Sequence, residues 1–592
     1  MWLVFVVIVL TSVVRNEVFR GTTNVVNWDG YGYYAYLPGI FIYGDVGEYA
    51  FAEKHFQEYD VSSNVYQLNR AASGHRFPIY NIGLSVIWAP AFLVTHGIVS
   101  ATGIVPADGM SYPYQLMVVL MGLLFAFLGL LYLRRFLARY FTDLVVAFTL
   151  VATGLATNLF YYMVEKPDMT HGYLFSLYAI FLYHFSQLPD DDGTTATSSS
   201  GSAQISRRRR ALAKLGLLAG LMCLVRSSEI VVFAIPAFYG LRNLTTLKRN
   251  FRRTLPVFVV ALAVFSVQLV YYKIGTGSWW QNGYAGLGFD WAAPHLYEGL
   301  FGFRRGWLVY TPIMALALAG VVWLRREWFP PVLIFLLGNC YLLFSWHIWW
   351  YGNTFGSRPV VQSYALLALP LAALLAWVSG ADAGAKEGSG AGFRTRILVP
   401  LLLTPFVLLN LFQHWQYNQR IIPLDFVNQT YYRHVFGKTT LDKHDYVYLD
   451  TNEKFPGGNM AKSLFADIDT LLPIPPQSSR EFVNILDAPL PVSTVGEDLW
   501  LRTTFAYSYH GNTYNKWKFP GLVTEQKREG ETVKWVQINI PRTTVDPAGD
   551  SLAFDLKLAG VQPGESIRQY FWNLSEDSMT LRNFRVRLLR PE

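Results

Sequence analysis

Residues 113–133, with the sequence PYQLMVVLMGLLFAFLGLLYL, form an apolar run that contains no charged side chain. A transmembrane helix needs about 20 consecutive apolar residues, and this run reaches that length. Arg134 and Arg135 follow it directly, as basic residues do at the cytoplasmic end of a membrane span. The run therefore predicts a helix that crosses a bilayer.

Further apolar runs occur through the first 414 residues of this chain of 592 residues, which is 52% hydrophobic and only 15% charged. We expect about eleven transmembrane helices in total, and hence an α-helical polytopic membrane protein. The first run is short for a span, and a cleaved signal peptide is the alternative interpretation of it. Besides 113–133, the expected spans are residues 2–14, 144–163, 168–187, 212–225, 229–241, 255–273, 306–324, 329–346, 360–379 and 396–413.

The basic residues between these runs predict the orientation of the chain. They cluster in alternate loops, which the positive-inside rule places in the cytoplasm. The formal net charge of +8 therefore reports topology rather than binding to nucleic acid. The alternation requires that residues 79–105 do not cross completely, and the prolines and glycines there favour an interfacial or re-entrant helix. The clusters are Arg134, Arg135 and Arg139; Arg207 to Arg210; Arg242, Lys248, Arg249, Arg252 and Arg253; Arg325 and Arg326; and Lys386, Arg394 and Arg396.

Four segments fall on the opposite face, which is extracytoplasmic in this topology. Every chemically suggestive residue outside a helix lies in one of them, so we expect the functional site there. The cytoplasmic segments 189–206 and 380–392 have the composition of linkers, and we assign them no catalytic or binding role. Cys223 and Cys340 lie in separate apolar runs and predict no disulfide. The extracytoplasmic segments are residues 15–112, 165–168, 275–306 and 346–359.

The composition changes after the last apolar run, from long apolar stretches to alternating segments separated by Pro, Gly and Asp. This pattern predicts an extracytoplasmic all-β sandwich of the jelly-roll type at residues 415–592, after a transmembrane domain at 1–414. Exposed rings there would bind sugar, but a buried core role is favoured for Trp500, Trp517, Trp535 and Trp572. The expected strands are residues 499–509, 533–540, 551–558, 566–574 and 581–589.

An aspartate surrounded by aromatic residues follows the first apolar run, in WDGYGYYAY at residues 28–36. Transfer of a sugar from a lipid phosphate to a hydroxyl needs a base for the acceptor proton, and a single carboxylate suffices. Asp29 is our candidate for this base, and N-capping of the next helix is its structural alternative. Asp45 is a second candidate for substrate binding, together with Glu48, although an ordinary solvated turn also explains both.

The turn at residues 165–171 carries Glu165, Asp168 and His171 between two expected helices. This density of polar groups predicts a site for the acceptor or for a divalent cation, with a self-paired charge cluster as the alternative. A divalent cation is the one cofactor that the sequence suggests, and the sequence leaves open whether a metal is required. Arg226 and Glu229 are spaced i to i+3 on an expected helix, which favours a pair that neutralises itself within the bundle.

Three arginines break the positive-inside trend on the outer face. Arg304 and Arg305 precede one span, and Arg358 precedes another. A polyprenyl phosphate presents an anion at the membrane surface, and guanidinium groups suit it well. We therefore expect these arginines to bind the donor phosphate, with snorkelling to lipid headgroups as the alternative.

At these residues the chain resembles the GT-C class of glycosyltransferases, specifically bacterial relatives of the protein O-mannosyltransferase and lipid A aminoarabinose-transferase group. The resemblance covers roughly residues 1–414. It implies a first-loop catalytic carboxylate, interfacial helices after it and a polyprenyl-phosphate sugar as donor, and it adds Arg76 to the substrate-binding candidates. The chain has Gly30 where the group has the second acid of an Asp-Glu pair, and only one proline follows its basic residue. The matching elements are WDG (28–30), RFPI (76–79), FRRG (303–306) and FGSR (355–358).

Together these patterns predict an inverting glycosyltransferase, with a glycan, lipid or protein as acceptor. The expected location is the bacterial inner membrane, with the site facing the periplasm. A lipid-linked sugar flippase or transporter is the alternative from another class, although the sequence lacks the internal repeat typical of transporters. A glycan ligase or polymerase is a further alternative, which would accept an oligosaccharide on a diphosphate lipid.

Overall fold

The computed structural model divides the chain into two compact units, and each is described by itself. The first comprises residues 1–301 and 305–414, and the second comprises residues 302–304 and 415–592. The structure describes residues 1–62, 65–188, 201–284, 287–380, 389–424, 427–441, 445, 460–491, 499–510, 520–540, 550–558, 560–574 and 577–591.

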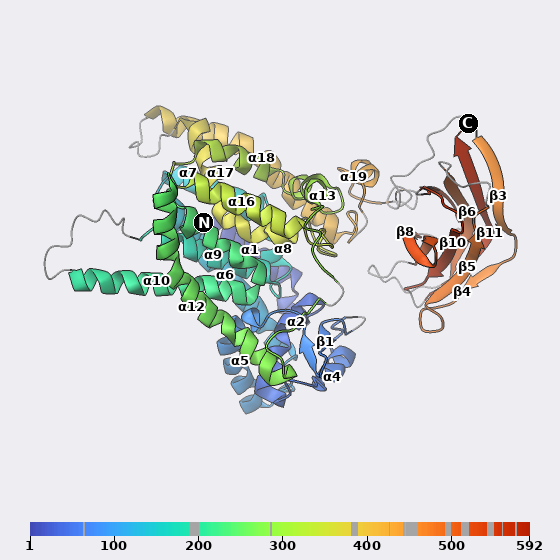
Figure 1. Cartoon of the computed structure of the whole chain (residues 1–592), viewed down its shortest axis with the longest axis horizontal. Helices are drawn as coiled ribbons and strands as arrows, with labels where there is room; N and C mark the ends of the chain where they lie inside the picture. Colours follow the sequence, from blue (N-terminus) through green and yellow to red (C-terminus); the bar gives the residue numbers. More distant parts are fainter. Residues whose placement is uncertain are drawn as a thin grey trace. The chain divides into compact units, whose positions relative to one another are not determined.

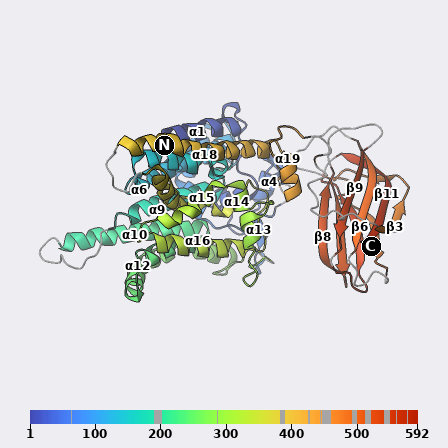
Figure 2. The same cartoon turned by 90° about the horizontal axis from the view of Figure 1, so that it is seen from above.

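The first unit is a bundle of helices, with one two-stranded antiparallel hairpin, β1 and β2, in the first loop (Figures 1 and 2). Its elements are α1 (Trp2–Arg15), η1 (Val18–Arg20), α2 (Asp29–Tyr34), α3 (Tyr36–Pro38), η2 (Gly39–Tyr43), α4 (Phe51–Glu58), β1 (Leu68–Arg70), β2 (Arg76–Pro78), α5 (Gly83–Thr102), α6 (Tyr112–Leu137), α7 (Asp143–Leu155), α8 (Leu159–Val164), α9 (Thr170–Phe185), α10 (Gly201–Val225), η3 (Ser227–Phe233), α11 (Ala234–Phe238), α12 (Leu244–Thr276), α13 (Leu296–Phe301), α14 (Trp307–Tyr310), α15 (Ile313–Gly320), η4 (Val321–Trp323), α16 (Phe329–Phe344), η5 (Arg358–Ser363), α17 (Tyr364–Ser379) and α18 (Ser389–Asn418).

The bundle confirms the predicted helical class, with several apolar helices. Five helical segments are long and apolar enough to cross a membrane: 83–102, 112–137, 244–276, 358–379 and 395–418. Five shorter apolar helices accompany them, at 2–15, 143–155, 227–238, 313–323 and 329–344. The total of about eleven crossings stays a prediction. The first of the five segments is α5, and its predicted interfacial placement also stays a prediction.

One predicted span, residues 144–163, is interrupted between α7 and α8, where Asn158 is buried. The Asn158 amide donates to the carbonyls of Phe355 and Ser357, at 3.2 and 3.3 Å, and its Oδ1 accepts from Tyr364 Oη at 2.7 Å. A buried polar side chain needs such partners. The break therefore fixes the segment that leads into Arg358.

The helix that follows Arg358 lies at the centre of the bundle. η5 and α17 are almost entirely buried, and α17 packs against α7, α9 and α15. A helix without a lipid-facing side has little freedom to move relative to its neighbours. Arg358 is therefore held at the start of the most buried of the five helical segments that are long enough to cross a membrane.

The second unit contains the antiparallel β-sandwich that was predicted for the C-terminal region. Within the described residues, one sheet has the order β5-β10-β7-β8, and the other has the order β3-β11-β6-β9 with short β4 paired to β11. This distribution of eight long strands over two sheets is the jelly-roll arrangement. The helix of this unit is α19 (Gln429–Val435), and the strands are β3 (Met460–Ile468), β4 (Leu472–Ile474), β5 (Phe482–Pro489), β6 (Trp500–His510), β7 (Gly521–Arg528), β8 (Glu531–Asn539), β9 (Asp550–Lys557), β10 (Ser566–Trp572) and β11 (Ser578–Pro591).

The tryptophans of the sandwich do not all have the buried core role that was expected for them. Trp500 is buried and packs against Leu589, as predicted. Trp535 is 39% exposed, so its core placement was wrong, because its alternate position on β8 faces solvent. Trp572 is half-buried and donates from Nε1 to Glu481 Oε1 at 3.0 Å. Trp517 lies outside the described residues.

Candidate active site

Asp29 is the first residue of α2, and its carboxylate does not cap that helix. Trp28 precedes it with φ 47° and ψ −128°, a left-handed conformation that a tryptophan rarely adopts. The Trp28 N–H donates to Val61 O at 2.9 Å, and its carbonyl accepts from Gln67 Nε2 at 3.1 Å. The N-capping alternative is therefore not observed, and the backbone strain lies at the residue directly before Asp29.

The fold brings together Asp29 and Arg358, which lie 329 residues apart in the chain. Arg358 Nη1 and Asp29 Oδ2 are 2.6 Å apart, and their side chains are 17% and 18% exposed. Tyr66 donates its hydroxyl hydrogen to Asp29 Oδ1 at 2.6 Å, and Tyr80 also hydrogen-bonds to this carboxylate. Asp29 is thus held in one orientation by a cation and two phenols.

The protonation of Asp29 follows from these contacts. Burial raises the pKa of a carboxyl group, but the positive charge of Arg358 and the hydrogen bonds from Tyr66, Tyr80 and Arg358 outweigh it. The pKa of Asp29 is therefore lowered from its ordinary value. Asp29 is an ionised carboxylate at neutral pH.

A second carboxylate, that of Asp168, packs against the backbone of Gly30. A Cβ atom added to Gly30 would lie 1.9 Å from Asp168 Oδ2, which no side chain tolerates. Gly30 therefore admits Asp168 next to Asp29. Asp168 is buried, and neither of its carboxylate oxygens has a hydrogen-bond partner among the described residues. Burial raises the pKa of Asp168 to about 6, and the negative charge of Asp29 adds to this rise.

The raised pKa of Asp168 predicts a pH dependence of stability. The native state holds the Asp168 proton more tightly than the unfolded chain does, so stability falls as pH rises from about 4 to about 6. The difference from the ordinary value corresponds to about 3 kcal/mol. Asp168→Asn has no proton to lose at this position. The melting temperature of the variant should therefore increase relative to that of the wild type between pH 4.5 and pH 7.

The comparison with the variant isolates Asp168 from other titrating groups. His55, whose pKa burial lowers to about 4, changes stability in the opposite direction over this range, but both proteins contain it. An equal difference in melting temperature at the two pH values would show that Asp168 is not a high-pKa carboxyl.

The other acid of the predicted turn, Glu165, is occupied elsewhere. Its Oε1 lies 2.6 Å from Arg15 Nε and 3.2 Å from His414 Nε2. Burial raises the pKa of Glu165, but His414 and then Arg15 outweigh burial and hold it at about 2. These partners come from other helices rather than from the turn itself, and the predicted substrate-binding role of Glu165 stays a prediction.

His171 is buried in α9, with Nδ1 3.3 Å from Gln362 Oε1. Of the residues that the structure describes, no three His, Cys, Asp or Glu side chains are placed to hold a metal ion. The divalent cation considered for the turn at 165–171 stays a prediction, and no catalytic step is assigned to one.

Two further candidates from the first loop make local contacts. Asp45 accepts from the backbone N–H groups of Gly47, Glu48 and Ala50, at 3.4, 2.8 and 2.7 Å. These bonds are those of the ordinary turn that was its alternative. Arg76 lies on β2 and approaches Glu53 to 3.3 Å. The substrate-binding roles of both residues stay predictions.

Arg304 and Arg305 fall in different units of the chain. Arg305 is buried just before α14. Arg304 and Phe303 belong to the second unit, and both are half-buried. Their predicted role in phosphate binding stays a prediction.

Arg226 is a cation near the site. The sequence predicted that it pairs with Glu229. The α10 helix ends at Val225, and Arg226 is extended, with φ −153° and ψ 117°, so helical i to i+3 spacing does not apply. Glu229 instead accepts from Tyr178 Oη and Gln362 Nε2, each at 2.8 Å. No direct ion pair joins Arg226 and Glu229 among the described residues, although the positive charge of Arg226 still acts on Glu229. Arg226 lies over the ring of Tyr351, 5.6 Å from its centroid.

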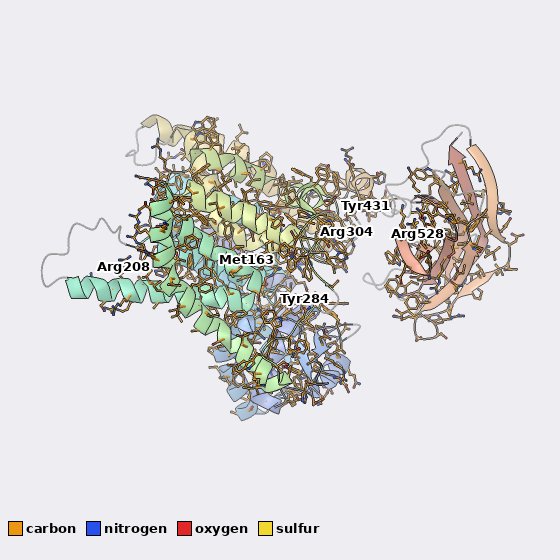
Figure 3. The ribbon with its side chains drawn as sticks, viewed as in Figure 1. Met163, Arg208, Tyr284, Arg304, Tyr431 and Arg528 are labelled. Atoms are coloured by element: carbon orange, nitrogen blue, oxygen red, sulfur yellow. The ribbon has the colours of Figure 1, made fainter. Side chains whose placement is uncertain are left out.

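Aromatic rings enclose the Asp29–Arg358 pair. The rings of Tyr33 and Tyr80 stack at 4.4 Å, and Tyr80 contacts Tyr284 edge-on at 6.1 Å. Tyr284, labelled in Figure 3, continues to Trp346 at 5.2 Å. Arg226, Asp29 and Arg358 all influence the pKa of the Tyr284 hydroxyl, which burial raises. The two arginines and the carboxylate thus share one ring-lined surrounding.

No family model and no curated protein matches the sequence. Solved structures similar to the chain include the oligosaccharyltransferase AglB from Archaeoglobus fulgidus with an inhibitory peptide and a dolichol-phosphate (13% identity, 77% of this chain and 61% of that chain, TM-score 0.42). They also include ArnT from Cupriavidus metallidurans bound to undecaprenyl phosphate (15%, 73% and 68%, 0.41) and the arabinosyltransferase EmbB from Mycobacterium smegmatis (12%, 85% and 59%, 0.30).

All three similar proteins are glycosyltransferases of the GT-C class, the class that the sequence resembles. The chain spans about three-fifths of the length of the oligosaccharyltransferase. The three TM-scores are all below 0.5.

Proposed function

We propose that the chain is an integral-membrane glycosyltransferase. It moves a sugar from a polyprenyl-phosphate donor to a hydroxyl of a glycan, lipid or protein acceptor, on the extracytoplasmic face of a bacterial inner membrane. The observation that supports this most strongly is the ion pair between Asp29 and Arg358 within a cage of tyrosines. It places a carboxylate base beside a guanidinium that suits a phosphate.

The proposed reaction is a direct displacement with inversion. The acceptor hydroxyl oxygen forms a bond to the anomeric carbon while the bond from that carbon to the phosphate oxygen breaks. Asp29 takes the hydroxyl proton, and the phosphate leaves with the bonding electron pair. A lipid phosphate is stable as an anion, so the reaction needs no general acid.

Donor binding would release Asp29 for this role. In the structure, Arg358 neutralises Asp29 and keeps it a weak base. A donor phosphate would attract the same guanidinium, which then shares its charge between the two anions. The basicity of Asp29 therefore rises when the donor is present, and acid–base chemistry begins only in the loaded site.

Arg226 and Asp168 have supporting roles in this proposal. Arg226 is a second guanidinium beside the same rings, so the departing phosphate receives two cations. Asp168 is close enough to raise the proton affinity of Asp29 by like-charge repulsion. Protonation of Asp29 removes this repulsion, which favours the proton transfer.

Reconstitution in proteoliposomes tests the proposed function. Undecaprenyl-phosphate and dolichyl-phosphate monosaccharides with a radiolabelled sugar are supplied together with cell-envelope extract as acceptor. We expect label to move from the lipid to the acceptor. Movement of the labelled lipid across the bilayer without transfer would instead identify a flippase. Transfer only from a diphosphate-linked oligosaccharide would identify a ligase or polymerase.

A further inference from the structure

A basic groove lies between the N-terminal parts of α10 and α12, on the side that is predicted to be cytoplasmic. Its volume is about 720 Å³. Six cationic side chains line it, and no acidic side chain is among the described residues that do so. Figure 3 labels one of them, Arg208, on α10. The lining residues are Arg208, Arg209 and Leu212 from α10, and Thr245, Lys248, Arg249, Arg252, Arg253 and Pro256 from α12.

The packing of the two helices fixes the shape of this groove. A Cβ atom on Gly216 would lie 2.6 Å from Val260 Cβ, and one on Gly220 would lie 2.7 Å from Val264 Cβ. The contacts advance by four residues on both helices, so α10 and α12 run parallel and touch at their backbones. Both helices therefore present their N-terminal parts at the same end. The basic groove lies on the N-terminal side of these close backbone contacts.

The groove is distinct from the proposed active site. Arg226 follows the opposite end of α10, and 16 residues of helix separate Arg209 from Val225. At 1.5 Å per residue this is about 24 Å. A ligand in the groove would not contact Asp29 or Arg358.

Exposed apolar side chains lie on a flank of α12, beginning at the level of the groove. Phe251, Leu255 and Val259 are 55%, 59% and 57% exposed, and they follow one another at helical spacing on a helix long and apolar enough to cross a membrane. Exposed apolar side chains on such a helix face acyl chains. Cations at the membrane boundary above an acyl-chain surface match the two parts of an anionic phospholipid.

We propose that this groove binds the headgroup of an anionic glycerophospholipid, with its acyl chains along the exposed face of α12. Four of these cations, Arg209, Lys248, Arg249 and Arg252, already exceed the contacts that a single phosphate offers, so the two-phosphate headgroup of cardiolipin fits better than phosphatidylglycerol. Without an anion these four like charges repel one another across the groove. Bound lipid therefore stabilises the α10–α12 pair.

The test compares two double variants that each remove two positive charges. Arg249→Gln with Arg252→Gln alters the groove, whereas Arg207→Gln with Arg210→Gln alters exposed arginines of α10 that do not line it. Native mass spectrometry of the purified proteins measures bound cardiolipin, phosphatidylglycerol and phosphatidylcholine. We expect the groove variant to bind cardiolipin about 30-fold more weakly than the wild type, and the control variant to bind it within about threefold.

Melting temperature supplies a second measurement on the same samples. Cardiolipin should raise the melting temperature of the wild type and of the control variant, but not that of the groove variant. Equal loss of binding in both variants, or equal binding of phosphatidylcholine, would overturn the proposal. Stabilisation by inorganic phosphate to the same extent as by cardiolipin would identify a soluble anion instead. A groove variant that fails to fold even with cardiolipin is compared as Arg249→Gln alone, for which about a fivefold loss is expected.

Discussion

Asp29→Asn is expected to reduce sugar transfer by about 10²- to 10⁴-fold, because it removes the proton acceptor and keeps the shape of the side chain. The amide still accepts a hydrogen bond from Tyr66, so the local structure should persist. Steady-state transfer from the labelled donor in proteoliposomes measures the effect.

Glu58→Gln is the matched control for this variant. It makes the same change of charge in the same loop, but Glu58 is an exposed residue of α4 that pairs with Lys54. We expect it to retain transfer within about twofold of the wild type, since surface substitutions of this kind have small effects. An equal loss of transfer in both variants would attribute the effect to the fold of the loop rather than to Asp29.

Arg358→Gln should lower kcat/KM by about 10²- to 10³-fold, because it removes a charged ligand of the donor phosphate. It also removes the positive charge that counteracts the effect of burial on Asp29, so the pKa of Asp29 rises. Asp29 must be ionised to act as a base. The acidic limb of the pH–rate profile should therefore move to higher pH in this variant.

Two substitutions separate the charge of Arg358 from general effects. Arg358→Lys keeps the charge but lacks the forked donor geometry, and we expect it to recover part of the rate and the wild-type acidic limb. Arg70→Gln removes an exposed arginine of β1 in the first loop that donates to the Gly74 carbonyl, and it should leave the profile unchanged. An acidic limb in Arg358→Gln that coincides with the wild type would contradict the proposed coupling.

The residue types of the site could be predicted from the sequence, but its contacts could not. Asp29 and Arg358 stand out because one is a lone acid among rings and the other breaks the positive-inside trend. The approach of Asp168 through Gly30 is a tertiary contact between distant segments, which no local pattern encodes. The direct contact expected between Arg226 and Glu229 is absent because the chain becomes extended where a helix was expected to continue.

The sandwich shows a similar division. Strands β6 and β8 to β11 alternate between apolar and polar residues, and their positions were predicted. The β7 strand was missed because its inner face carries buried Thr524 and Gln526 in place of apolar residues. Thr524 accepts from Gln569 Nε2 at 2.9 Å, and Gln526 donates to Glu565 at 2.6 Å, so hydrogen bonds replace hydrophobic packing there.

Single-turnover transfer by the Asp29→Asn protein, saturated with labelled donor, measures the chemical step apart from donor binding. With Arg358 and Arg226 intact, the variant should bind donor at least as tightly as the wild type and transfer less than about 1% as fast. Transfer from the bound donor at the wild-type rate would contradict the role of Asp29 as the base.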